Sequence, residues 1–186
     1  MSLNKTIIGF TGPKQSGKST AAEYLVAGGF KKLSFAEPIK DMTWYFLRCL
    51  GCDAHYIEQL LTVKKEVVIP GLGVSARHIM QTLGTDWGRD TIHPNLWVML
   101  MSNRLANEDS DYLVFDDIRF ENEASAIRSL GGLIIHINRG DLVSDDLHES
   151  EAGIELHKDD GAVDNDYAVA GFLADVDAAV AEFVSA

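Results

Sequence analysis

The chain has 186 residues, of which 46% are hydrophobic and 24% are charged. These values are typical of one globular domain that can bury a core without disulfides or a structural metal. Its 16 Lys and Arg against 28 Asp and Glu give a formal net charge of −12. This charge argues against a protein that coats a nucleic-acid polymer, because neutralising phosphates needs a basic surface, but a few local cations can still hold a small phosphorylated ligand.

The sequence carries no membrane or secretion signal that we can identify. No apolar run reaches about 18 residues, and residues 1–9 lack the basic-then-apolar order of a signal peptide. Cys49 and Cys52 are the two cysteines, which excludes a disulfide framework and predicts the reducing cytoplasm. Their C-x-x-C spacing falls near the end of a predicted helix rather than at a strand-to-helix turn, so we interpret them as structural thiols.

Short apolar segments alternate with helical patterns along the chain, and Gly or Pro marks many of the boundaries. The apolar segments predict strands at residues 6–10, 30–35, 112–115, 133–137 and 167–169. The helical spacing predicts helices at residues 18–26, 38–50, 57–61, 76–83, 95–105, 121–130 and 172–184. Ser75 is expected to cap one of these helices and Gly84 to end it. Residues 138–163 are polar and predict a mobile excursion.

Residues 12–19 read Gly-Pro-Lys-Gln-Ser-Gly-Lys-Ser and match the phosphate-binding pattern G-x-x-x-x-G-K-[ST] at every fixed position. Gly12 and Gly17 let successive backbone N–H groups surround a phosphate, and the helix N-terminus adds partial positive charge. Lys18 is expected to reach the β- and γ-phosphates of ATP, and the Ser19 hydroxyl to bind Mg²⁺. The predicted ATP-binding residues are Gly12, Lys14, Gln15, Ser16, Gly17, Lys18, Ser19 and Thr20.

An acidic pair, Asp116 and Asp117, follows the predicted strand at residues 112–115. A phosphate loop needs such an acid at the end of a neighbouring strand to orient Mg²⁺. Asp116 is favoured as the metal ligand because it follows the strand directly, and Asp117 is expected to position the acceptor or a phosphate-binding cation. An acidic pair that simply ends a strand is the alternative.

The order of elements predicts an α/β fold, a P-loop kinase three-layer sandwich with a mostly parallel sheet and helices on both faces. A GTPase would carry an N-K-x-D segment, which this chain lacks. The helical stretch before the acidic strand instead favours a nucleotide or metabolite kinase. We expect a single domain, with a core at residues 1–34, 108–138 and 163–186. A helical acceptor-binding insert is expected at 35–107, and a lid-like excursion at 139–162.

Four further segments resemble the bacteriophage-type deoxynucleoside monophosphate kinases. They are Ser-Phe-Ala-Glu-Pro-Ile-Lys at 34–40, Gln-Thr-Leu-Gly-Thr-Asp-Trp-Gly-Arg at 81–89, Phe-Asp-Asp-Ile-Arg-Phe-Glu-Asn-Glu at 115–123 and Asp-Leu-His-Glu-Ser-Glu at 146–151. The second and third are much more specific than the phosphate loop. The resemblance implies that the chain transfers the γ-phosphoryl group of ATP to a deoxynucleoside 5′-monophosphate, with Mg²⁺, to give the diphosphate. The role of residues 148–151 is left open.

This reaction needs cations near the acceptor phosphate and flat or polar groups near its base. The insert and its surroundings supply acceptor-binding candidates, namely Phe35, Lys40, Arg77, Gln81, Trp87, Arg89 and Asp117. Arg119 is expected near the transferring phosphoryl group and Arg139 on the lid, as an arginine finger in cis. With Lys18 and Asp116, these two arginines are the predicted catalytic residues. Trp87 in a core, Arg77 in solvent or Arg139 in a surface ion pair are the alternatives.

Two other functions stay open. A small-metabolite kinase such as a dephospho-coenzyme A kinase shares the loop and the general layout. A nucleotide-sensing module would hold ATP without transferring phosphate, although such a module does not need a second phosphate site. We expect ATP and a deoxynucleoside monophosphate as partners, no nucleic-acid polymer and no membrane, and leave a homodimer open.

Overall fold

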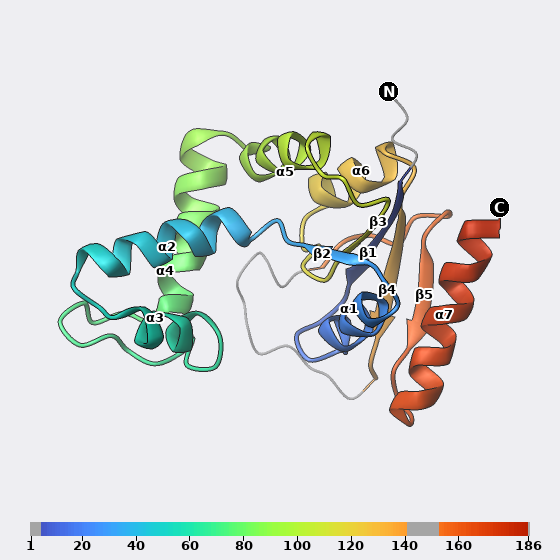
Figure 1. Ribbon diagram of the computed structural model, residues 1–186, viewed down its shortest axis with the longest axis horizontal. Coiled ribbons are helices and arrows are strands. Elements are labelled where there is room, and N and C mark those ends of the chain that lie inside the picture. The colour runs from blue at the N-terminus through green and yellow to red at the C-terminus, as the bar shows by residue number, and fades with distance from the viewer. Residues whose placement is uncertain (1–4, 141–152, 186) are drawn as a thin grey trace. The chain divides into compact units, whose positions relative to one another are not determined.

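The computed structural model describes residues 5–140 and 153–185. The chain divides into two compact units. The sheet unit comprises Met1–Phe35 and Asn107–Ala186, and the helical unit comprises Ala36–Ala106 (Figure 1). The prediction that they form a single kinase domain, with the second unit as an acceptor-binding insert, stays a prediction.

The sheet unit is built on parallel strands, as the sequence predicts. They are β1 (Thr6–Thr11), β2 (Lys31–Leu33), β3 (Tyr112–Phe115), β4 (Leu133–Asn138) and β5 (Gly161–Asp164). Their order in the sheet is β2-β3-β1-β4-β5, and every neighbouring pair is parallel. Because parallel strands are covered on both faces, they read as continuous apolar runs, which is why the sequence identified β1, β3 and β4. All the strands therefore end at one edge of the sheet.

Helices cover both faces of this sheet. Helix α1 (Lys18–Ala27) packs against α7 (Val169–Ser185) on one face, where Ile8 and Phe10 contribute to the core. Helix α6 (Glu121–Ser129) contacts β1 and β4, and its Ile127 meets Ile7 around Gly132 on the other face. Figure 1 shows α7 running beside β5. The three-layer α/β architecture is therefore confirmed for the sheet unit.

The helical unit has its own hydrophobic core. Its helices are α2 (Glu37–Cys49), α3 (Ala54–Leu61), α4 (Ala76–Thr82), the π-helix η1 (Leu83–Ile92) and α5 (Leu96–Ala106). The core consists of buried Leu47, Ile57, Leu60, Leu61, Ile69 and Ala76. Ser75 Oγ accepts a hydrogen bond from the His78 N–H at 3.2 Å, so the predicted N-cap of α4 is confirmed.

The expected helix end at Gly84 is wrong. The chain continues from α4 into η1 without a break, and Gly84 lies inside it. The Trp97 indole N–H donates to the Gly84 carbonyl at 2.7 Å, and a Cβ on Gly88 would lie 2.4 Å from the Trp97 ring. Gly88 thus makes room for the buried Trp97 ring, and Gly84 accepts its indole N–H through the backbone instead of ending the helix.

The expected last strand at residues 167–169 is also wrong. The last strand is β5, which begins inside the predicted excursion, and α7 already begins at Val169. The Ala168 carbonyl accepts from the N–H groups of Gly171 and Phe172, as in a first helical turn. Gly161–Asp164 has only one large apolar residue, and its pairing with β4 comes from tertiary packing rather than from a local apolar signal.

Candidate active site

The phosphate loop joins β1 to α1 and has a strained backbone. Gly12 has φ 141° and Gly17 φ 110°, while Gln15 has φ 67°, a left-handed value that is uncommon for a residue with a side chain. A Cβ on Gly12 would lie 2.4 Å from the Ile137 carbonyl oxygen, so glycine is required there. Successive backbone N–H groups in such a loop form a concave anion-binding site at the start of a helix.

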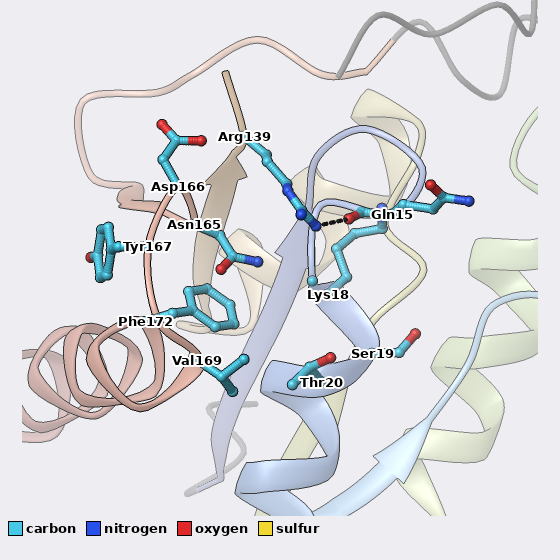
Figure 2. Close-up of a pocket in the computed structure, with 11 residues that line it drawn as sticks. Gln15, Lys18, Ser19, Thr20, Arg139, Asn165, Asp166, Tyr167, Val169 and Phe172 are labelled. Carbon is cyan, nitrogen blue, oxygen red and sulfur yellow. Dashed lines mark hydrogen bonds between the residues drawn. The ribbon is translucent and has the colours of Figure 1, made fainter. Parts of the chain in front are cut away.

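Two cations bind the carbonyl groups of this loop. Lys18 Nζ donates to the carbonyl oxygens of Gly12 and Pro13 at 2.7 and 2.6 Å. Arg139, which follows β4, extends across the loop and donates from Nη1 to the Gln15 carbonyl at 3.1 Å (Figure 2). The structure therefore brings the predicted catalytic residues Lys18 and Arg139 to the same loop, although they are far apart in the sequence.

The Asp116 carboxylate is bound by two side chains at the end of β3. Its Oδ2 accepts from Ser19 Oγ at 2.8 Å and from Lys32 Nζ at 2.6 Å. Hydroxyl and carboxylate oxygens are the ligands that suit Mg²⁺. The pairing of Ser19 with Asp116 thus fits the metal site that the sequence predicts, while Lys32 was missed because no motif marks it.

Asp117 faces different partners from its neighbour. Its Oδ2 accepts from Ser34 Oγ at 2.7 Å, and its Oδ1 accepts from the Phe35 N–H at 3.3 Å. These contacts fix the residues that follow β2. Phe35 itself is only 3% exposed and packs on Phe115 with ring centroids 5.3 Å apart, so the predicted contact of its ring with a base is not supported.

A cavity of about 440 Å³ adjoins the phosphate loop within the sheet unit. Its lining residues come from the loop, α1, the end of β4 and the segment leading into α7, and are Gln15, Gly17, Lys18, Ser19, Thr20, Arg139, Asn165, Asp166, Tyr167, Val169 and Phe172. Figure 2 shows Val169 and Phe172 on the side of α7 and Thr20 on α1. A volume of this size is within the range of small-molecule sites.

The segment after β5 supplies cavity residues that sequence analysis missed. Asn165 Nδ2 donates to the Ser16 carbonyl at 2.8 Å, and the Gly140 N–H donates to Asp166 Oδ1 at 2.7 Å. The segment is thus tied to the phosphate loop and to the end of β4. Polar residues just after a parallel strand are the signal that could have found them, but the strand was expected at the wrong place.

Tyr167 lies beside the cavity, and its acidity is strongly reduced by its surroundings. Its hydroxyl donates to Asp175, and this hydrogen bond, with burial and the charges of Asp164 and Asp166, raises the pKa of Tyr167 to about 12. Tyr167 therefore stays protonated over the physiological range. Tyr167 can therefore donate a hydrogen bond and line the cavity with its ring, but it cannot act as a general base.

Two further predicted residues, Ser16 and Arg119, are held in place by burial and by a backbone hydrogen bond, respectively. Ser16 is fully buried, and its Oγ has no hydrogen-bond partner among the described residues. The backbone N–H of Arg119 donates to Glu123 Oε2 at 2.9 Å, and that of Phe120 donates to the same oxygen at 3.2 Å. Since Glu123 is only 3% exposed, it holds the start of α6 rigidly after the acidic pair.

The remaining predicted acceptor residues lie in the helical unit. Lys40 is on α2, Arg77 and Gln81 are on α4, and Trp87 and Arg89 are on η1. Arg77 Nε lies 3.3 Å from Glu66 Oε1, and Arg89 is only 9% exposed and donates to the Pro94 carbonyl at 3.4 Å. Trp87 is 40% exposed, so the alternative that it is ordinary core is wrong. Their part in acceptor binding stays a prediction.

Several other predictions concern the lid and the cysteines. Half of the lid-like excursion, residues 141–152 with the whole 148–151 segment, lies outside the described residues. Cys49 is exposed and Cys52 partly buried, and neither forms a disulfide.

In residues 5–140 and 153–185, no group of three or more His, Cys, Asp and Glu side chains could hold a metal ion. No helix among the described residues is long and apolar enough to cross a membrane.

Similarity to solved structures supports the architecture. A crystal structure of a Thermus thermophilus protein aligns with a TM-score of 0.51 and covers 96% of this chain and 97% of its own. The sequence identity is 17%, so this likeness concerns the fold alone.

Sequence relatives define the family. The model of the deoxynucleotide monophosphate kinase family matches residues 57–176. A protein of Acanthamoeba polyphaga mimivirus that carries this family's name is 34% identical over 175 residues, covering 82% of this chain and 83% of its own. The deoxynucleoside-5′-monophosphate kinase of Escherichia phage T5 is 30% identical over 106 residues, covering 52% and 42%. Because the family model spans more than half of the chain and the mimivirus protein aligns over most of both lengths, this chain belongs to the deoxynucleotide monophosphate kinase family.

Proposed function

We propose that the chain transfers the γ-phosphoryl group of ATP to a deoxynucleoside 5′-monophosphate, with Mg²⁺, and releases ADP and the deoxynucleoside diphosphate. The observation that carries this proposal is the joint placement of Lys18, Arg139 and the Ser19–Asp116 pair around one phosphate loop. Family membership supplies the class of acceptor.

The donor nucleotide is proposed to bind in the sheet unit. Its phosphates would accept from the loop N–H groups and from Lys18, which would leave the carbonyls of Gly12 and Pro13. Ser19 and Asp116 would hold Mg²⁺, which neutralises charge on the transferring group when it is bound. The adjoining cavity has the size for the nucleoside, with Arg139 and Tyr167 as candidate walls for its base.

The acceptor is proposed to contact residues of the helical unit, and the role of Asp117 in positioning it stays a prediction. Lys40, Arg77 and Arg89 would neutralise its phosphate, and Gln81 and Trp87 would meet its base. The low exposure of Arg89 supports a positioned cation, because a buried guanidinium keeps its orientation better than one in water. We do not assign Phe35 to this site, since its ring packs on Phe115.

Catalysis in this proposal depends on position and charge rather than on a base. Lys18, Arg139 and Arg119 would offset the negative charge of the γ-phosphoryl group as it moves between the two nucleotides. Exclusion of water by the predicted lid would suppress plain ATP hydrolysis, and residues 141–152 of that lid lie outside the described residues.

Further proposals concern partners and location. Small nucleotides are the proposed partners, and the net charge of −12 argues against a nucleic-acid polymer as a partner. The two free cysteines support a reducing compartment such as the cytoplasm. A homodimer stays a prediction without direct support.

A panel of acceptors tests the function. Each of the four common deoxynucleoside monophosphates, one ribonucleoside monophosphate and dephospho-coenzyme A is supplied with ATP and Mg²⁺, and ADP release is recorded with and without acceptor. We expect turnover that depends on a deoxynucleoside monophosphate and is lost in Lys18→Ala. Turnover of dephospho-coenzyme A alone would assign a small-metabolite kinase instead. ATP binding without any acceptor-stimulated turnover would assign a sensing module.

A further inference from the structure

A lysine that no motif marks is bound to the proposed metal ligand. Lys32 Nζ lies 2.6 Å from Asp116 Oδ2, the oxygen that also accepts from Ser19 Oγ at 2.8 Å. Lys32 is on β2 and 84 positions away from Asp116 in the sequence, and β2 pairs with β3 so that the two residues meet. Each member of the proposed metal site therefore already has a hydrogen-bond partner, and the carboxylate has a counter-ion.

An ammonium group at this place competes with a divalent cation. The same carboxylate oxygen can bind either the Lys32 ammonium group or a metal ion with its bound water. In addition, the ammonium group repels a divalent cation that lies a few ångströms away from it. With Lys32 in place, the Lys32–Asp116 pair has no net charge, so it attracts a free metal ion less strongly than the carboxylate alone would. The ammonium group instead adds positive charge beside the loop that receives the anionic nucleotide.

The neighbouring residue shows that the contact is specific to one side of the strand. Lys31 Nζ lies 2.9 Å from Glu108 Oε1, and these two side chains are 53% and 8% exposed, against 37% and 11% for Lys32 and Asp116. Side chains alternate along a strand, so adjacent lysines reach different carboxylates. Lys31 thus offers a matched control, with the same residue type, the same strand and an ion pair of similar length.

We propose that Lys32 is the built-in counter-ion of the Asp116 metal site and keeps the nucleotide-free site from binding a divalent cation by itself. When a nucleotide is bound, its phosphates would offer Lys32 another anionic partner, and Ser19 and Asp116 would then be able to hold the metal. Lys32 is a positioning residue in this scheme, because it acts on the metal ligand and not on the substrate. The inference rests on the proposed function only in the identity of the Ser19–Asp116 pair as the metal site.

Manganese binding to the nucleotide-free protein tests the inference. Mn²⁺ replaces Mg²⁺ and its free concentration is followed by electron paramagnetic resonance. In Lys32→Met we expect one Mn²⁺ site with a dissociation constant at least about fivefold lower than that of any Mn²⁺ site in the wild type. An effect of this size is expected when a partly exposed positive charge is removed beside a divalent cation. Lys32→Gln should behave like Lys32→Met, and Lys32→Arg like the wild type, because the arginine restores the charge.

Two control variants separate this site from other carboxylates of the acidic chain. Lys31→Met also frees a carboxylate, that of Glu108, but should leave Mn²⁺ binding as in the wild type. Adding Asp116→Asn to Lys32→Met should abolish the new site. Equal Mn²⁺ affinity in Lys32→Met, Lys32→Gln and the wild type would overturn the inference, and so would an equal gain in Lys31→Met.

A nucleotide titration distinguishes this inference from the proposed function. The affinity for a non-hydrolysable ATP analogue is measured by calorimetry with Mg²⁺ and with a chelator. We expect Mg²⁺ to strengthen binding in the wild type and to strengthen it several-fold more in Lys32→Met. A wild type that does not bind the analogue would overturn the proposed function, whereas a wild type that binds it with the same Mg²⁺ effect as Lys32→Met would overturn the role of Lys32 alone.

Discussion

The sheet unit and the helical unit arrange their charged side chains in different ways. In the sheet unit, Lys18 and Arg139 bind carbonyls of one loop, and Ser19 and Lys32 bind one carboxylate oxygen. In the helical unit, each charged side chain has its own partner: Arg104 pairs with Glu37, Arg77 pairs with Glu66, and Arg89 donates to the Pro94 carbonyl. The sheet unit therefore gathers the polar groups of the proposed site at one edge of its sheet, whereas the charged pairs of the helical unit are spread over several helices.

This difference follows from the two kinds of architecture. Parallel strands all end at the same edge of a sheet, so residues that follow β1, β3, β4 and β5 meet there whatever their distance in the sequence. Helices packed around an apolar core offer no such edge, and each presents its own polar face. A contiguous sequence motif can thus predict a site in the sheet unit, whereas the sequence of the helical unit indicates only single candidate residues.

The largest expected effect concerns Lys18. We expect Lys18→Ala to lower kcat by about a thousandfold, because charge stabilisation at the phosphoryl group is lost while the fold is kept. Steady-state kinetics measures the loss, and circular dichroism checks the fold. Lys31→Ala, which removes a lysine of the same unit outside the site, should keep the wild-type kcat. A comparable loss in both variants would mean that the sheet unit does not concentrate its function at the loop.

The next prediction asks whether Arg77 binds the acceptor or only pairs with Glu66. Arg77→Met should raise the KM for the acceptor about tenfold and leave the affinity for ATP unchanged, because one charge-assisted contact with a phosphate is removed. Glu66→Gln breaks the same ion pair but keeps the guanidinium group. If both variants changed the KM equally, Arg77 would be a structural residue and the helical unit would have one acceptor cation fewer.

The packing of η1 tests how far the helical unit depends on its glycines. A Cβ on Gly88 would lie 2.4 Å from the Trp97 ring and 3.0 Å from the Leu83 carbonyl oxygen. We expect Gly88→Ala to lower the free energy of unfolding by about 2 to 3 kcal/mol, measured by urea denaturation. Gly161→Ala is the control in the sheet unit, since its Cβ would meet Ile135 at an ordinary 3.4 Å. Equal stability of the two variants would show that η1 relaxes without cost.

The smallest expected effect concerns an ion-pair network that joins β4, α6 and the residues before β5. The side chain of Asp160 is 1% exposed and accepts from Arg128 Nε and Nη2 at 2.9 and 2.7 Å and from His136 Nε2 at 3.0 Å. Burial by itself would raise the pKa of Asp160, but the hydrogen bonds from Arg128, the His157 N–H and His136 outweigh it and lower the pKa below 3.8. The ionised form is therefore favoured in the folded state.

The sign of the pH dependence follows from this lowered pKa. Its stabilising contribution is fully present above pH 3.8, the ordinary value, and is lost as the pH falls through the lower folded value. Asp160→Asn should lower the free energy of unfolding by about 1 to 2 kcal/mol at pH 7. The difference from the wild type should shrink as the pH falls below 3.8. A difference that stayed constant down to pH 2 would contradict the role of the charge.

Much of the fold and part of the site could be predicted from the sequence. The strands at β1, β3 and β4 are continuous apolar runs, and Ser75 and the phosphate loop are local signals. Gly84 and β5 were predicted wrongly because each depends on a partner distant in the sequence, Trp97 in one case and β4 in the other. Asn165 and Tyr167 were missed for the same reason, since the position of β5 places them.

The sequence by itself determined the chemistry of the phosphate loop, because the loop's backbone geometry is set by contiguous residues and by glycines with positive φ. It also determined that a carboxylate follows the neighbouring strand. Only the tertiary structure decided which of the two aspartates faces Ser19, because β3 directs Asp116 to α1 and Asp117 to the end of β2. The pairing of Lys32 with Asp116 also needed the fold, since 84 positions separate two residues that meet only because β2 lies beside β3.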